Sequence, residues 1–125
     1  MSDVAEIHVK NLDNADEIRK FVAHGYAEFV TAGGMRLSRG TFEPGWRWSQ
    51  DVKPIMQTDT CPVHHLGLIL SGRMRIEYDD GTSADLRPGD VIDVAPGHEA
   101  MVLGEEPCVV IDVSPDFFRY AAPHT

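Results

Sequence analysis

The sequence predicts an all-β domain, an antiparallel sandwich or barrel, and three observations support this. From Gly25 onward, short segments that favour β structure alternate with turns rich in glycine and proline. The Asp79–Thr82 segment is a strong hairpin turn, since Gly81 accepts the positive φ that such turns require. Only one stretch, near the N-terminus, has the start signals of a helix. Closely spaced short strands joined by turns are typical of a sandwich or barrel.

The one helix is expected over about Ala15–Phe21. Asn14 stands three residues before Glu17, which is the spacing of a capping box, and the acidic Asp16 lies between them. A short edge strand is predicted before it, at Ile7–Val9.

The remaining elements are expected to be strands. Their ranges are Tyr26–Val30, Met35–Phe42, Val63–Leu70, Arg73–Tyr78, Thr82–Leu86, Val91–Ala95, Ala100–Leu103 and Cys108–Val113. Residues 46–60, which include Pro54, are predicted to form a loop-rich crossing. The Val63–Leu70 segment is largely apolar on both faces, which suits a strand that is covered on both sides.

The composition indicates one globular domain of 125 residues, with 42% hydrophobic and 25% charged residues. A chain of this length supports a single core, so residues 1–125 are taken as one domain. Eleven basic residues against 20 acidic ones give a formal charge of −9. Nucleic acid and anionic membrane surfaces are therefore poor partners, because both are bound mainly through Lys and Arg.

A cytoplasmic location is expected. The N-terminus is acidic and has no apolar core, unlike a signal peptide. No apolar run reaches the roughly 20 residues that span a bilayer. Cys61 and Cys108 are accordingly predicted to be free thiols in a reducing compartment.

The turns and strands resemble those of the cupin superfamily over about residues 36–113. The resemblance is carried by the His65–Gly72 spacing, the hairpin at Asp79–Gly81, and the Pro88-Gly-Asp and Pro96-Gly97 turns. It implies a double-stranded β-helix, or jelly-roll barrel, that is usually a homodimer. It does not imply one function, because cupins include metal-dependent enzymes, storage proteins and regulators.

The first cupin motif is altered at its metal-ligand positions. With six residues between it and Gly72, His65 stands where the family has glutamate. The two usual histidine positions then fall on Asp59 and Cys61.

The second motif also departs from the family. The usual histidine position falls on Ala100, whereas His98 directly follows Gly97. The family's ligand set therefore cannot be transferred, and the site has to be argued from chemistry.

The candidate metal ligands are Asp59, Cys61, His65 and His98, whose side chains all bind first-row transition metals at about 2.0–2.3 Å. On a straight strand, Cys61 and His65 would lie roughly 13 Å apart. They can share an ion only if the chain turns between them, and Pro62 is a plausible position. Without a metal, Cys61 is simply a small buried hydrophobe and His98 caps its turn.

A ligand pocket is predicted from large side chains, since aromatic rings suit the walls of small-molecule sites. Trp46 and Trp48 share a face if this segment is extended, and Met56 or Met101 would lie nearby. Packing in the core is the alternative role for these residues.

We therefore expect a small cupin that binds a divalent metal and a small organic ligand, with metal-dependent catalysis as one use. The ion could be Zn, Fe, Ni, Cu or Mn: two histidines with a carboxylate suit iron, and histidines with a thiolate suit zinc or copper. The alternatives are a metal-free binding or sensing module, and a structural dimer whose side chains fill the pocket.

Overall fold

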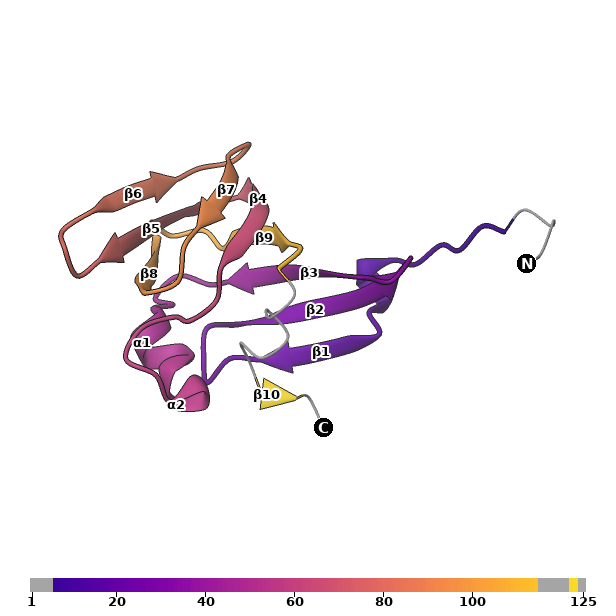
Figure 1. Cartoon of the computed structure of the whole chain (residues 1–125), viewed down its shortest axis with the longest axis horizontal. Coiled ribbons are helices and arrows are strands. Elements are labelled where there is room, and N and C mark those ends of the chain that lie inside the picture. The colour runs from indigo at the N-terminus through magenta and orange to yellow at the C-terminus, as the bar shows by residue number, and fades with distance from the viewer. Residues whose placement is uncertain (1–5, 115–121, 124–125) are drawn as a thin grey trace.

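The computed structural model describes residues 6–114 and 122–123, which form two antiparallel sheets (Figure 1). The seven-stranded sheet has the order β10-β1-β2-β3-β9-β4-β7, and the three-stranded sheet has the order β6-β5-β8. The strands of the first sheet are β1 (Glu17–Lys20), β2 (Gly25–Ala32), β3 (Met35–Phe42), β4 (His65–Ser71), β7 (Val91–Val94), β9 (Cys108–Asp112) and β10 (Ala122–Pro123). Those of the second are β5 (Arg73–Tyr78), β6 (Ser83–Leu86) and β8 (His98–Leu103).

The winding of the chain between the sheets is that of a double-stranded β-helix. The chain crosses from one sheet to the other after β4, β6, β7 and β8, while β5 and β6 form a hairpin within the smaller sheet. In the outer position next to β8, the smaller sheet has isolated bridges, which pair Arg47 with Met101 and Cys61 with His98. Two single-turn helices follow the bridge at Arg47, α1 (Trp48–Asp51) and α2 (Lys53–Met56), where the sequence predicted a loop-rich crossing.

The helix predicted over about Ala15–Phe21 is wrong. The helical turn in this region is the 3-10 helix η1 (Leu12–Asn14), whose cap is Asn11, and the chain then enters strand β1. Residues Ile7–Val9, predicted as an edge strand, have no regular secondary structure.

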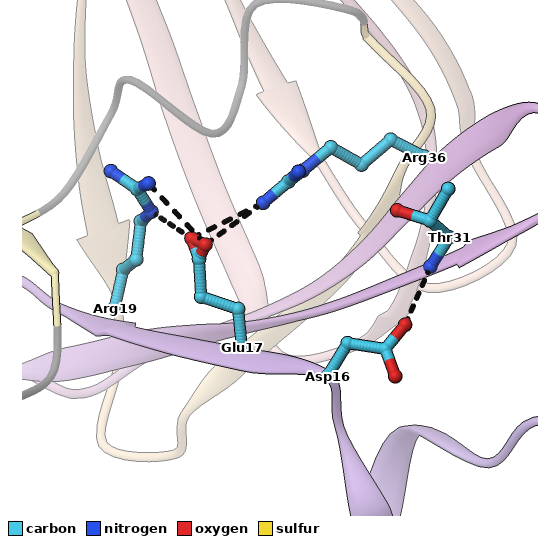
Figure 2. Close-up of polar contacts among 5 residues, drawn as sticks. All are labelled: Asp16, Glu17, Arg19, Thr31 and Arg36. Atoms are coloured by element: carbon cyan, nitrogen blue, oxygen red, sulfur yellow. Dashed lines mark hydrogen bonds and ion pairs between the residues drawn. The ribbon is translucent and has the colours of Figure 1, made fainter.

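Long-range pairing explains this outcome. Strand β1 pairs with β2 in the register Glu17↔Phe29, and the Asp16 carboxylate accepts the Thr31 backbone N–H. Figure 2 shows the Glu17 carboxylate directed at the guanidinium groups of Arg19 and Arg36 rather than at a helix cap. A local capping pattern is a weak signal, and here the sheet overrides it.

Strand β4 has very different surroundings on its two faces. The inner face places His65 and Ile69 in the interior, as predicted. The outer face is open in the single chain, where Leu66 and Leu70 are 42% and 47% exposed. The prediction that both faces are covered is therefore not met within one chain.

Aromatic side chains close one end of the core. The ring centroids of Phe21 and Phe42 are 5.0 Å apart, and those of Phe42 and Trp46 are 4.6 Å apart. Trp46 and Trp48 are almost fully buried. No helix in the described part of the chain is long and apolar enough to span a bilayer.

Candidate metal centre

Three potential metal ligands meet inside the barrel: Cys61, His65 and His98. One ligand atom from each lies within 4.8 Å of the others, and all three side chains are buried. His65 begins β4 and His98 begins β8, so the two sheets each supply one imidazole. The structure thus brings together three of the four residues predicted to bind metal.

The chain turns between Cys61 and His65, as this convergence requires. The Cys61 backbone pairs with His98 in an isolated antiparallel bridge, through Cys61 N–H to His98 O at 2.9 Å. Residues 62–64 then leave this pairing before β4 begins. The result is a distance of 3.4 Å from Cys61 Sγ to His65 Nε2, which a straight strand could not give. Gly97 immediately before His98 has φ +98°, a conformation that favours glycine.

Hydrogen bonds behind the two imidazoles fix their orientation. His65 Nδ1 lies 2.8 Å from Asp112 Oδ2, and His98 Nδ1 lies 2.9 Å from the Ala95 carbonyl oxygen. Carboxylate and carbonyl oxygens accept hydrogen bonds, so each Nδ1 is the donor and each Nε2 carries the lone pair of the ring. Outer hydrogen bonds of this kind orient histidines that bind metals.

Two further contacts support these outer groups. The second oxygen of Asp112 accepts the Ser114 backbone N–H at 2.7 Å. The Tyr78 hydroxyl donates to the same Ala95 carbonyl that receives the His98 proton, at 2.8 Å. The ring centroids of Tyr78 and His98 are 6.0 Å apart, so Tyr78 packs beside the imidazole that it helps to hold.

Burial keeps Cys61 and His98 uncharged when no ion is bound. Burial raises the pKa of the Cys61 thiol to about 12, an effect partly offset by the Val63 backbone N–H and the Trp48 indole. Burial likewise lowers the pKa of His98 to about 4. At neutral pH the thiol is therefore protonated and can donate to His65 Nε2. A bound metal ion would take the place of that proton.

Asp59, the fourth predicted ligand, lies outside the centre. Its side chain is exposed on a bend that precedes Cys61, and it does not belong to the cluster. Asp112 was not singled out from the sequence. The sequence feature that could have identified it is a single carboxylate in the otherwise apolar strand Cys108–Asp112, at an inward-facing position.

A small cavity adjoins the two imidazoles. Its volume is about 30 Å³. This is enough for roughly two water molecules. His65, His98 and Asp112 supply its polar wall. The remaining lining is apolar and consists of Phe42, Met74, Ile76, Leu86, Ile92, Val94, Ala100 and Val110.

The predicted ligand-pocket residues do not line this cavity. Trp46 and Trp48 lie in the hydrophobic core, and Met56 packs against that core. Met101 pairs with Arg47, whose guanidinium lies 3.3 Å from the Met101 sulfur. Their contact with a ligand stays a prediction.

No family model and no curated protein matches the chain. Among solved structures, a cupin 2 conserved barrel domain protein from Salinispora arenicola has 15% sequence identity and a TM-score of 0.58, covering 93% of this chain and 94% of that one. The chain has the cupin fold.

Two larger proteins with a similar structure have names that indicate a bound metal or an enzymatic activity. The iron(II) form of HppE has 10% identity and a TM-score of 0.61, covering 86% of this chain and 60% of that one. An oxalate decarboxylase variant from Bacillus subtilis has 19% identity and a TM-score of 0.56, covering 98% of this chain and 35% of that one. The chain spans only part of these two proteins, and identities this low show a shared fold alone.

Proposed function

We propose that this cupin-fold chain binds a divalent metal ion through Cys61, His65 and His98, and holds a small organic molecule beside it. The observation that carries this proposal is the buried cluster itself, with three ligand atoms within 4.8 Å of one another. His65 Nε2 lies 3.4 Å from Cys61 Sγ, and the Nδ1 atoms of both imidazoles are bound from behind, so Nε2 is the nitrogen that each would offer to an ion. Iron(II) in HppE supports the idea that this fold accommodates a metal.

Zinc is the ion that we propose for this donor set. One thiolate and two imidazoles suit zinc or copper better than manganese or magnesium, which prefer oxygen ligands. Three protein ligands with an open fourth position are typical of catalytic zinc, whereas structural zinc usually has four. Asp59, the carboxylate that would have favoured iron, lies outside the cluster.

The protein residues around the ion would have separate tasks. Zinc, when bound, supplies a Lewis acid that polarises a coordinated oxygen. Asp112 holds His65, and the Ala95 carbonyl with Tyr78 holds His98. The apolar cavity beside the imidazoles would exclude bulk water from a molecule at the open position. A metal-dependent enzyme is the function that best uses this arrangement.

A metal-free binding or sensing module is the second candidate. It is favoured by the contact between Cys61 Sγ and His65 Nε2, because a protonated thiol satisfies that nitrogen without an ion. Burial favours this protonated state, because it raises the pKa of the Cys61 thiol to about 12. The same contacts therefore allow an ordered metal-free form.

Metal analysis separates the two candidates. Protein purified without chelator, and without a nickel affinity step, is expected to contain one zinc ion per chain within error. His65→Ala should remove most of this metal. His64→Ala is the matched control, since His64 is exposed on the neighbouring position and contacts Asp93 instead. Wild-type protein with metal far below stoichiometry would contradict the metal proposal. Ligand-induced melting shifts of that metal-free protein would then support the binding module.

A further inference from the structure

The proposed centre balances its own charge. Asp112 is 2% exposed and hydrogen-bonded to His65, and Cys61 would be a thiolate when a metal is bound. The two positive charges of a divalent ion thus meet one thiolate and one carboxylate at short range. A loaded site with no net charge offers little attraction to an anion.

The cavity wall offers no positive group either. Among the described residues that line it, none is Lys or Arg, and the polar ones are His65, His98 and Asp112. A carboxylate moved from water into this cavity would lose its hydration without gaining a cationic partner. Its negative charge would also lie near the buried Asp112.

A groove between β6 and β7 lies on the other side of one cavity wall. It shares four lining residues with the cavity, namely Ile76, Leu86, Ile92 and Val94. The groove has a volume of about 400 Å³, far larger than the cavity. Because these four side chains line both the cavity and the groove, we take the groove as the route of approach.

Carboxylates surround this route. Asp85, Asp90 and Asp93 all line the groove. Asp85 is paired with Arg75 at 2.7 Å, but neither Asp90 nor Asp93 is paired with Lys or Arg among the described residues. A hollow lined by one sign of charge disfavours the entry of the same sign, and the chain as a whole carries −9.

We propose that this site selects a small uncharged molecule and excludes carboxylates, an inference that rests on the proposed metal centre. The ligand has one lone pair for the ion and only a few non-hydrogen atoms, because the cavity holds roughly two water-sized molecules. Small alcohols, carbonyl compounds and amides belong to this class. Dicarboxylates do not.

Formamide and formate test this selection, since they have the same number of non-hydrogen atoms and differ in charge. Cobalt(II) replaces zinc in the wild-type protein to give visible absorption bands that report on the open position. Both probes are titrated at constant ionic strength while these bands are followed. The concentration of formamide that gives half of the full band shift should be about tenfold lower than that of formate.

Ile92→Lys sharpens the test by placing a cation at the cavity wall. Ile92 lines both the cavity and the groove, so a lysine stem can lie in the cavity wall while its ammonium group reaches the groove. The preference between formate and formamide should move toward formate by about tenfold. Met35→Lys is the control for an added cation, because Met35 is 61% exposed at the start of β3 and lines neither the cavity nor the groove, so its preference should match that of wild type.

The outcomes are distinct. Tighter binding of formate than of formamide to wild type would overturn the proposal, and so would bands that respond to neither probe. Failure of cobalt to bind would contradict the metal centre itself, and this is seen before either probe is added. An equal shift in Ile92→Lys and Met35→Lys would show that the charge at the cavity wall does not set the preference.

Discussion

His64 and His65 are consecutive in the chain, yet they lie in opposite surroundings. Each contacts a carboxylate, His64 that of Asp93 and His65 that of Asp112. The side chains of His64 and Asp93 are 54% and 74% exposed, whereas those of His65 and Asp112 are 10% and 2% exposed. Because successive residues of an extended chain point to opposite faces, one histidine reaches the thiol of Cys61 and the other faces solvent.

The pairing of a histidine with a carboxylate therefore does not by itself indicate a metal site. The exposed pair is screened by water and contributes little free energy. The buried pair lies in a low-dielectric interior, where it sets which nitrogen of His65 carries the proton.

The largest effect is the pH dependence of zinc binding. The pKa of Cys61 is raised to about 12, so the thiol must lose a proton to bind zinc at any pH below that value. The pKa of His98 is about 4, so this imidazole is already neutral and adds no dependence above that pH. The association constant should therefore rise about tenfold per pH unit between pH 6 and 8.

Competition with a chromophoric chelator, corrected for the chelator's own protonation, measures this slope. In Cys61→Ala the part of the slope due to the thiol should disappear. Cys108→Ala is the control, since burial also raises the pKa of Cys108 to about 12 but this thiol does not belong to the cluster. An association constant that does not change with pH in wild type would contradict thiolate ligation.

The second effect compares the two carboxylates directly. Asp112→Asn removes the negative charge behind His65 and should weaken zinc binding by about 10- to 100-fold. Asp93→Asn removes the corresponding charge behind His64 and should change zinc binding by less than about twofold. Both are measured by chelator competition at one pH. Equal effects would show that Asp112 does not act through the metal ligand.

The turns allowed much of the fold to be predicted. Strands β3 and β5 have the predicted bounds, because glycine turns delimit each of them closely. The helix over residues 15–21 could not be rejected locally, since its capping pattern was real and only the pairing of β1 with β2 overrode it.

The three residues of the cluster could also be predicted as candidate ligands, because their chemistry is visible residue by residue. Cys61, His65 and His98 required only that the chain turn near Pro62. Asp112 is 47 residues from His65 in sequence, and no local pattern links the two. The environments of Trp46 and Trp48 likewise depend on how the crossing folds into α1, which turn signals alone do not specify.

The smallest effect on the metal is expected from the outer face of β4 and its neighbour β7, where Leu66, Leu70 and Val91 are exposed. We propose that a second copy of the chain covers this apolar face, in line with the homodimer expected from the sequence. Light scattering at micromolar concentration should give the mass of a dimer, and Leu66→Asp should give that of a monomer with unchanged metal content. Met35→Asp is the control, because Met35 is equally apolar and 61% exposed at the start of β3. A monomeric wild type would contradict this proposal.

X-ray absorption at the zinc edge of the loaded protein tests the metal centre most directly. The account predicts one sulfur at about 2.3 Å and two imidazole nitrogens at about 2.0–2.1 Å, with a light atom in the fourth position. Cys61→Ala should remove the sulfur, and Cys108→Ala should leave it unchanged. A first shell of oxygen and nitrogen alone in the wild-type protein would contradict the account.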